Sequence, residues 1–335
     1  MTTIRINGPK PYDILIEPGA LERHAFATTG DQLVISDRNV ARWYDIQPDA
    51  PHHIIEPGER SKDIANYVQA LEKLASINAK RDTTIFALGG GVVGDLAGFV
   101  AATWMRGIDY VQIPTTLLAM VDSSVGGKTA IDLHNAKNLV GAFHPPRFVL
   151  IDPQVLDSLP SREFNAGMAE VIKYGMIFDE TFLTWLEENV DFIGARDAET
   201  MAALIGKCVQ FKADVVERDL YEKGDRALLN FGHTFAHAIE AEQHYGELNH
   251  GEAVAIGMVL ATQLSGLDTV RLTSLLKKFN LPTRTEMDAD ALIKRMQLDK
   301  KATRGGLRLI TLEDYGRAVI EENVAEARVR SVLQR

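Results

Sequence analysis

The sequence passes from a strand into a helix within Thr83-Thr-Ile-Phe-Ala-Leu-Gly-Gly-Gly-Val-Val-Gly-Asp95. Thr83–Leu88 is a short apolar run of the kind that forms a buried strand, and it leads directly into Gly89–Gly91. Glycines at the start of a helix let the backbone approach a pyrophosphate closely, and the helix N-terminus offers N–H donors. The run is neither a complete Gly-x-Gly-x-x-Gly motif nor a Walker A loop. A tight strand-to-helix turn without a ligand therefore stays open as an alternative.

The rest of the first half alternates between strand-like and helix-like segments. Short β-type runs occupy Thr3–Ile6, Asp13–Ile16, Gln32–Ser36, Tyr110–Ile113 and Phe148–Ile151. Apolar residues recur at helical spacing over Ser61–Ile77, with Ser61 as the expected N-cap, and a helix is expected over Asp95–Thr103. Strands that alternate with helices predict a wound α/β sheet of mostly parallel strands.

The pattern changes after Pro153. Helical spacing dominates the segments 161–178, 180–190, 197–220, 228–243, 251–266 and 269–279, and Leu307–Thr311 is the clearest β-rich run among them. We therefore predict two domains, an α/β domain over residues 1–153 and an all-α domain over residues 154–335.

The composition of the 335 residues excludes several classes of protein. Hydrophobic residues make up 46% of the chain and the formal net charge is −10, so a large core can form and the surface lacks the basic character of nucleic-acid or anionic-membrane binders. The single cysteine, Cys208, excludes an internal disulfide and is expected inside a helix. No apolar run is long enough to span a membrane and Met1–Glu17 does not resemble a signal peptide, so we expect a cytoplasmic protein without nucleic-acid or membrane partners.

A candidate metal site comes from residues that lie far apart in the sequence. His233 and His237 are spaced to share one helix face, although such a pair can also be two ordinary polar positions. Glu170 and Lys173 lie on one face of a largely apolar helix, where buried charges need partners. His250 lies at a helix entrance. Glutamate and histidine ligands suit Zn²⁺ or Co²⁺, and three protein ligands leave room for catalysis.

A second polar concentration lies in Val121-Asp-Ser-Ser-Val-Gly-Gly-Lys-Thr-Ala130 and Asn135-Ala-Lys-Asn138. It holds Asp122, Lys128, Lys137 and Asn138, although each lysine taken singly can be a solvated surface residue. Further basic candidates are Arg106, Lys212, Arg226, Lys300 and Lys301. Basic residues gathered in these segments of an acidic chain indicate a phosphate or carboxylate substrate. Asp37, at the end of an early strand, is either a ribose ligand or a turn residue.

Together these motifs resemble the 3-dehydroquinate synthase family. The resemblance rests on Gly89–Asp95, Val111–Lys128, Glu170–Gly175, Leu229–His237, His250-Gly-Glu and Asp299–Lys301, which occur in the family's order over nearly the whole chain. It implies a homodimer with an N-terminal Rossmann-like, NAD-binding α/β domain and a helical C-terminal domain. It also implies NAD⁺ used catalytically, one Zn²⁺ or Co²⁺, and conversion of a phosphorylated seven-carbon keto-acid sugar into 3-dehydroquinate and phosphate.

The resemblance also implies roles for individual residues. The metal ligands would be Glu170, His233 and His250, and His237 would contact the substrate phosphate instead. The NAD site would comprise Asp37, Glu59, Lys62, Gly90, Gly91, Asp95, Thr115, Thr116, Asp122, Ser123, Lys128, Lys137 and Asn138. Substrate and catalytic contacts would be Lys173, Asp122, Lys128, His237, Asn230, Arg226, Lys212, Arg106, Asn138 and Lys301, with Lys300 as the alternative to Lys301 and Arg106 reaching the partner subunit's site.

Three alternative functions compete with this interpretation. A related sugar-phosphate cyclase with a deoxyinosose or valiolone product would share NAD and metal but differ at the substrate contacts. A metal-dependent polyol dehydrogenase would lack the set of Lys128, Lys173 and Lys212 and would release NADH in each turnover. A binding-only descendant would have lost a ligand or a lysine, and this sequence retains them.

Overall fold

The computed structural model describes residues 1–24, 28, 30–133, 136–219, 224–243, 248–298, 302–303 and 306–334. The chain divides into two compact units. The first unit comprises Met1–Pro160 and Arg196–Glu217, and the second comprises Ser161–Ala195 and Arg218–Arg335. A division at residue 153 stays a prediction. The compact units differ from it mainly because Arg196–Glu217, which follow residue 153 in the sequence, belong to the first unit.

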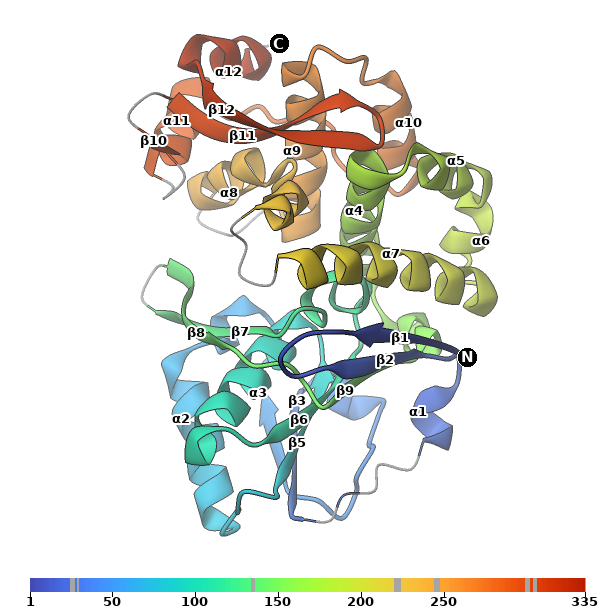
Figure 1. The fold of residues 1–335 in the computed structure, drawn as a ribbon, viewed down its shortest axis with the longest axis vertical. Helices are drawn as coiled ribbons and strands as arrows, with labels where there is room; N and C mark the ends of the chain where they lie inside the picture. The colour runs from blue at the N-terminus through green and yellow to red at the C-terminus, as the bar shows by residue number, and fades with distance from the viewer. Residues whose placement is uncertain are drawn as a thin grey trace. The chain divides into compact units, whose positions relative to one another are not determined.

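A seven-stranded sheet forms the centre of the first unit (Figure 1). Its order is β1-β2-β9-β6-β5-β3-β4, with β1 antiparallel to β2 and the other pairs parallel. The strands are β1 (Thr2–Ile6), β2 (Tyr12–Ile16), β3 (Gln32–Asp37), β4 (His52–Ile55), β5 (Thr84–Gly89), β6 (Asp109–Pro114) and β9 (Phe148–Ile151). This confirms the mostly parallel α/β sheet.

Both faces of the sheet are covered because its strands carry apolar residues in both directions. On one face, Leu33, Ile35 and Ile85 pack with α2 (Ile64–Ser76) and α3 (Gly91–Thr103). On the other, Val34 and Phe86 pack with α1 (Ala20–Arg23) and residues 40–50. The remaining helix of this unit, α7 (Ala198–Arg218), contains the buried Cys208, as expected.

The N-cap predicted for α2 is wrong. The helix begins at Ile64, and the side chain of Asp63 accepts the Asn66 backbone N–H. Ser61 lies in the preceding 3₁₀ turn, η2 (Glu59–Ser61). Both residues are good caps, but only Asp63 stands immediately before the first helical residue.

A two-stranded antiparallel hairpin of β7 (Lys128–Leu133) and β8 (Ala136–Phe143) also belongs to the first unit. It packs on α3 so closely that a Cβ at Gly98 would lie 2.4 Å from Cγ2 of Thr129. The sequence pattern did not predict this hairpin. Short helical turns complete the unit: η1 (Val40–Arg42), η3 (Trp104–Arg106), the π-helical η4 (Ala119–Ser123) and η5 (Pro153–Ser158).

The second unit is mainly helical, although it is not the all-α domain that the sequence predicted. Its helices are α4 (Ser161–Phe178), α5 (Glu180–Glu188), α6 (Val190–Gly194), η6 (Asp225–Asn230), α8 (His233–Glu242), α9 (His250–Leu264), α10 (Val270–Lys278), α11 (Ala289–Leu298) and α12 (Glu326–Leu333). It also holds a small antiparallel sheet of β10 (Ala302–Thr303), β11 (Gly306–Asp314) and β12 (Arg317–Val324). Among the described residues, no helix combines the length and apolar character needed to cross a membrane.

Candidate active site

The first group of candidate residues lies where the strand order of the large sheet reverses direction. From β3 the chain continues to β4 on one side, and from β5 it continues to β6 on the other. The register pairs Ser36 with Leu88, so the carboxyl ends of β3 and β5 are adjacent. Asp37 ends β3 and the glycine loop follows β5. Ligands of wound α/β sheets bind at such a switch point, beyond the carboxyl ends of the strands.

Asp37 is a turn residue, one of the two roles that the sequence left open for it. Its Oδ1 accepts the backbone N–H groups of Asn39 and Val40, at 2.8 and 3.1 Å. The carboxylate therefore fixes the turn after β3, and its second oxygen is not used in these two bonds. A turn aspartate in this position is compatible with a ribose contact.

The glycines of the loop pack closely against their protein neighbours. A Cβ at Gly90 would lie 3.0 Å from Cγ2 of Thr116, and a Cβ at Gly91 would lie 3.1 Å from Oγ of Ser123. Gly90 caps α3 without a side-chain hydrogen bond, and the Thr115 N–H donates to the Gly89 carbonyl at 3.0 Å. The structure therefore brings the NAD candidates Gly90, Gly91, Thr116 and Ser123 together.

Two buried hydroxyls near this loop have unused hydrogen-bonding capacity. Within the part of the chain that the structure describes, the Oγ1 of Thr115 and the Oγ of Ser123 have no hydrogen-bond partner. Buried polar groups are normally paired, so these atoms fit a polar ligand such as a dinucleotide phosphate or amide. The residues present thus suit the cofactor that the resemblance implies.

Lys62 joins three segments of the first unit. Its Nζ lies 2.9 Å from Glu59, 3.2 Å from Asp95 and 2.7 Å from Oδ1 of Asn138. The side chain is only 4% exposed. Four of the residues that the resemblance assigns to the NAD site therefore form one network, although their positions span 80 residues of sequence.

Asp132 is a member of this network that the sequence reasoning missed. Its Oδ1 accepts the Asn138 N–H at 2.8 Å and lies 3.9 Å from Nζ of Lys62. Asn138 has a positive φ of 54°, so this bond helps to hold a backbone conformation that few residues adopt. The sequence signal was weak, a lone aspartate within the apolar run Ala130-Ile-Asp-Leu133.

The charges of the network shift one another's pKa values. Burial raises the pKa of Asp95 to about 6, and the attraction of Lys62 offsets this only partly. Burial by itself would lower the pKa of Lys62, but Asp95 and Glu59 raise it overall. Lys62 therefore stays cationic at neutral pH, next to more carboxylates than it can neutralise.

Two substrate candidates of the first unit form a pair. Nζ of Lys212, on α7, lies 2.6 Å from Oδ1 of Asp122, in the π-helical turn η4. Such turns occur often at functional sites. The neighbouring candidates Lys128 and Lys137 lie exposed on the β7–β8 hairpin.

Arg106 is exposed in a strained turn after α3. Met105, Arg106 and Gly107 have positive φ angles of 47°, 70° and 123°. Each such non-glycine residue costs about 1–3 kcal/mol, and such strain persists only where the surroundings impose it. The turn therefore holds Arg106 outside the unit's own core.

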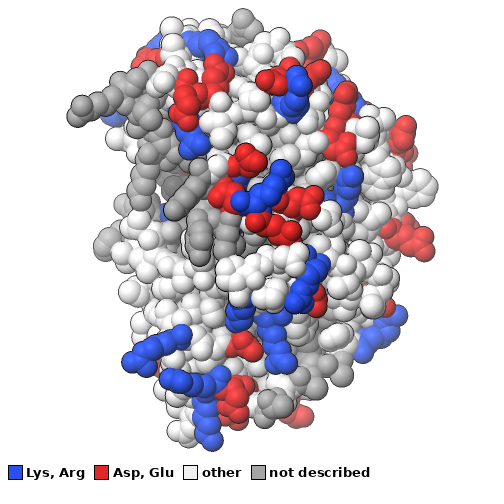
Figure 2. All heavy atoms as spheres, viewed as in Figure 1, with Lys and Arg blue, Asp and Glu red and all other residues white. Residues whose placement is uncertain are grey.

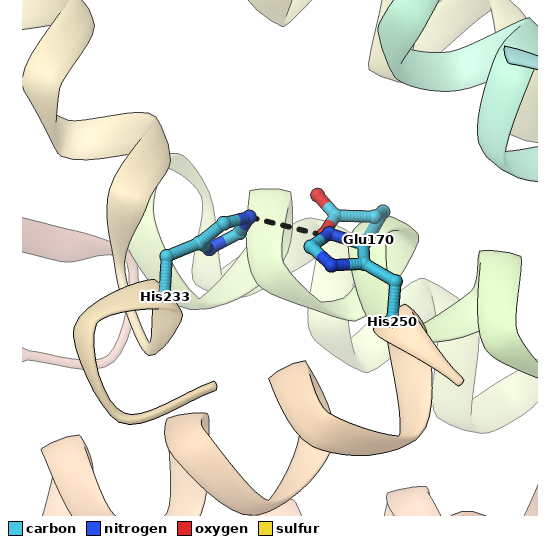
Figure 3. A group of neighbouring side chains, drawn as sticks. All are labelled: Glu170, His233 and His250. Atoms are coloured by element: carbon cyan, nitrogen blue, oxygen red, sulfur yellow. Dashed lines mark ion pairs between the residues drawn. The ribbon is translucent and has the colours of Figure 1, made fainter. Parts of the chain in front are cut away.

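The second group of candidates lies in the second unit and contains a metal-binding geometry. Glu170 on α4, His233 on α8 and His250 on α9 each offer a ligand atom, and these atoms lie within 4.8 Å of one another. Nε2 of His233 is 3.5 Å from Oε1 of Glu170, and Nε2 of His250 is 3.7 Å from the same oxygen. Figure 3 shows both imidazoles directed at this carboxylate.

His237 does not belong to this cluster. It follows His233 by one turn of α8, with the ring centroids 5.6 Å apart, and its side chain is exposed. Local spacing alone had made it a candidate ligand, and the family resemblance had replaced it with His250. The geometry agrees with the replacement.

The surroundings of the three residues fit a bound cation. Oε1 of Glu170 is buried and makes no hydrogen bond within the described residues, while Oε2 pairs with Lys173. Nδ1 of His233 lies 3.1 Å from the Phe231 carbonyl, which leaves Nε2 directed at the carboxylate. Histidine ligands usually donate their outer N–H in this way. Two Nε2 atoms and one carboxylate oxygen are the donors that Zn²⁺ and Co²⁺ prefer.

The pKa values agree with this chemistry for two of the ligands. Burial by itself would raise the pKa of Glu170, but the charge of Lys173 holds it well below its usual range. Burial, together with Lys173, lowers the pKa of His233 to about 3, so this imidazole is neutral. Burial would also lower the pKa of His250, but the neighbouring carboxylates of Glu170 and Glu240 raise it to about 9.

Three glycines set the spacing of the helices that carry the ligands. A Cβ at Gly251 would lie 2.1 Å from the Ala166 carbonyl oxygen, and a Cβ at Gly257 would lie 2.1 Å from that of Gly232. Gly232 also has a φ of 77°, immediately before His233 begins α8. The backbone of α9 therefore touches the backbone of α4 and the start of α8, next to the ligands.

The remaining candidates of the second unit lie close to these helices. Arg226 is buried and Asn230 half-buried in η6, which directly precedes α8 and contacts α4. Lys300 and Lys301 lie outside the described residues.

Comparisons with known proteins cover nearly the whole chain. A family model described as 3-dehydroquinate synthase N-terminal matches residues 52–166, and one described as 3-dehydroquinate synthase C-terminal matches residues 167–302. A 3-dehydroquinate synthase of Xylella fastidiosa (strain M23) is 49% identical, covering 99% of this chain and 98% of the relative.

Two solved structures share the fold at lower identity. A 2-deoxy-scyllo-inosose synthase complexed with carbaglucose-6-phosphate, NAD⁺ and Co²⁺ has a TM-score of 0.88 and 27% identity, with 99% of each chain covered. A 2-epi-5-epi-valiolone synthase from Streptomyces hygroscopicus subsp. jinggangensis 5008, with NAD⁺ and Zn²⁺ bound, has the same TM-score and identity, with 96% of each chain covered.

Proposed function

This chain belongs to the 3-dehydroquinate synthase family. We propose that its first residue group binds NAD⁺ and that its second residue group binds the divalent metal. The chain converts 3-deoxy-D-arabino-heptulosonate 7-phosphate into 3-dehydroquinate and phosphate, a step in aromatic amino-acid biosynthesis. The reaction proceeds by transient oxidation with NAD⁺, elimination of phosphate, re-reduction and intramolecular aldol closure. Its cofactors are NAD⁺ and one divalent metal. The observation that carries this function is the family match over nearly the whole chain.

The first group would bind the dinucleotide. The N-terminus of α3, at Gly90 and Gly91, offers backbone N–H groups and a positive dipole end to the pyrophosphate. Asp37 would accept a ribose hydroxyl through the oxygen that does not bond the turn. Thr115 and Ser123 would use their buried hydroxyls on the cofactor. Glu59, Lys62, Asp95, Thr116 and Lys137 complete the proposed contacts.

The second group would hold the metal and the reacting end of the substrate. Glu170, His233 and His250 would ligate the cation, which when bound supplies Lewis acidity to a substrate hydroxyl. Lys173, paired with Glu170, would donate a hydrogen bond to that hydroxyl oxygen. Because the pair is buried, the lysine is held in one orientation, and such preorganisation favours catalysis.

The substrate carries a carboxylate and a phosphate, which need cationic partners. We propose Lys128, Lys212, Arg226, His237 and Lys301 for these charges, with Arg106 reaching from a partner subunit. Asp122 would orient Lys212, to which it is bonded, while Asn138 and Asn230 would bond substrate hydroxyls. Holding one substrate conformer among fixed charges would leave the proton transfer of the elimination to the substrate phosphate itself.

A homodimer is proposed for the assembled enzyme. Strand β8 exposes Leu139 and Phe143, with about half of each side chain accessible. Exposed apolar residues on one short strand are typical of a surface that another chain covers. Sedimentation analysis should give twice the mass of the chain, and Phe143→Lys should shift the protein toward monomer. A wild-type protein that sediments as a monomer at assay concentration would rule the dimer out.

We further propose a cytoplasmic enzyme without nucleic-acid or membrane partners. On the face that Figure 2 shows, Lys and Arg side chains lie among Asp and Glu side chains. The net charge of −10 also supports a protein without nucleic-acid or membrane partners, because such partners require a basic surface.

Phosphate release tests the function directly. Purified protein with Zn²⁺ or Co²⁺ and trace NAD⁺ should release one phosphate per substrate molecule without net NADH accumulation at 340 nm. A hexose 6-phosphate, which has no carboxylate, should release far less. Stoichiometric NADH formation would indicate a dehydrogenase, and absence of phosphate release with both cofactors supplied would refute the assignment.

A further inference from the structure

Glu240 is a buried carboxylate beside the metal cluster that neither the sequence patterns nor the family resemblance singled out. It lies on α8, two turns after His233, and its side chain is only 6% exposed. Burying a carboxylate is costly unless it is paired. The Oε2 of Glu240 lies 3.4 Å from Nδ1 of His250. The position of this buried carboxylate next to His250 indicates that it acts on that metal ligand.

The two histidines of the cluster have different outer partners. Nδ1 of His233 faces a backbone carbonyl, at Phe231, whereas Nδ1 of His250 faces a carboxylate. In both rings a proton on Nδ1 leaves the lone pair on Nε2, the atom that faces Glu170. Either partner orients the ring and raises its basicity as a ligand. A charged carboxylate does so more strongly than a neutral carbonyl, because hydrogen bonds to ionised acceptors are stronger.

The neighbouring acid on the same helix shows that this placement is specific. Glu242, two residues later, is one-third exposed and bonds Nε of Arg295 at 2.9 Å. It therefore ties α8 to α11 and not to the cluster. Glu240 and Glu242 thus share a helix, a charge and a size, and differ in whether they reach a ligand.

We propose that Glu240 is a positioning residue, which fixes the tautomer and orientation of His250 and thereby strengthens binding of the divalent metal. This rests on the metal site of the proposed function. The effect should be seen in metal affinity before any substrate is added.

The test is a metal titration of Glu240→Gln with Glu242→Gln as the matched control. Each protein, freed of metal by a chelator, is titrated with Zn²⁺ against a chromophoric chelator, and with Co²⁺ while its visible absorption is recorded. Glu240→Gln should bind Zn²⁺ about 10- to 100-fold more weakly and show an altered Co²⁺ spectrum. Glu242→Gln should stay within about twofold of wild type, because it touches no ligand.

A second variant covers the case in which Glu240→Gln does not fold. Glu240→Asp keeps the charge but withdraws the oxygens by one methylene, so its Zn²⁺ affinity should fall between those of wild type and the glutamine variant. Tight binding by wild type together with unchanged binding by either Glu240 variant would overturn the positioning role and leave the enzyme assignment intact. Equal weakening in both glutamine variants would also overturn it, since that result indicates general damage to α8. If wild type bound no metal, the metal centre itself would be refuted.

Discussion

The pair His233→Ala and His237→Ala gives the sharpest test of the metal assignment. The two histidines lie one turn apart on α8, so both substitutions remove an imidazole from the same helix. Only His233 contributes an atom to the cluster with Glu170 and His250. The substitutions therefore separate a ligand from a neighbour with the same chemistry.

The expected difference follows from the number of ligands. Four-ligand structural zinc sites bind with about 10–16 kcal/mol, or roughly 2.5–4 kcal/mol for each ligand. Loss of one ligand from a cluster of three should therefore weaken the metal about 10²- to 10³-fold. His237→Ala removes no ligand atom, so its metal affinity should change by less than about threefold, while turnover falls through loss of a substrate contact.

Metal content after gel filtration, measured by inductively coupled plasma mass spectrometry, distinguishes these outcomes. Wild type and His237→Ala should retain about one equivalent, and His233→Ala should retain almost none. Circular dichroism of the metal-free proteins serves as the folding control. The reverse pattern, with His237→Ala empty and His233→Ala occupied, would show that the ligand set is wrong.

Three further perturbations follow from the structure. Gly98→Ala should lower the free energy of unfolding in urea by about 1–3 kcal/mol, because its Cβ would lie 2.4 Å from Thr129. Gly206→Ala is the control and should not lower it, because its Cβ would meet only ordinary contacts. Equal losses of stability in the two variants would contradict the packing argument. Burial raises the pKa of Asp95 to about 6, so the native state holds a proton that the unfolded chain loses near pH 4, and stability falls as the pH rises between these values. Asp95→Asn should therefore become more stable than wild type toward pH 7, by up to about 3 kcal/mol in urea denaturation of the cofactor-free protein; a constant difference between pH 4 and 7 would refute this. Removal of the metal with a chelator should abolish phosphate release. The affinity for NAD⁺, measured by calorimetry, should change less than about threefold, because the metal and dinucleotide candidates belong to different units. A large loss of NAD⁺ binding would count against that division.

Local sequence patterns sufficed for elements whose apolar periodicity is strong. Helix α4 occupies 161–178 and strand β9 occupies 148–151, as predicted. The β7–β8 hairpin was missed because Asp132, Lys137 and Asn138 interrupt the apolar residues of its strands. The packing of the hairpin on α3 explains its place in the fold. The small sheet of β11 and β12 was seen only as Leu307–Thr311, since its second strand is rich in charged residues. The membership of α7 in the first unit depends on contacts that no local pattern encodes.

Local sequence patterns were also insufficient to predict the residues of the candidate site. Spacing along one helix paired His233 with His237, yet the geometric partner of His233 is His250, from a different helix. Only the family resemblance made that choice from sequence. The network of Lys62 could not be derived from spacing at all, because Asp95 and Asn138 reach it from 33 and 76 residues away. Glu240 looked like an ordinary helix acid until its distance to His250 was known.

The glycine contacts among α4, α8 and α9 have a consequence for how variants of this enzyme should be interpreted. Gly232, Gly251 and Gly257 carry no donor atom, yet they set how near the three ligand-bearing helices approach. A methyl group at Gly251 would push α9 away from α4 while every ligand stayed in the sequence. A natural variant could therefore lose its metal with the full ligand signature intact, and a mutational scan confined to histidines and acids would not detect it. Binding of the cation therefore depends in part on glycines, which provide no ligand atom but allow the ligand-bearing helices to approach one another.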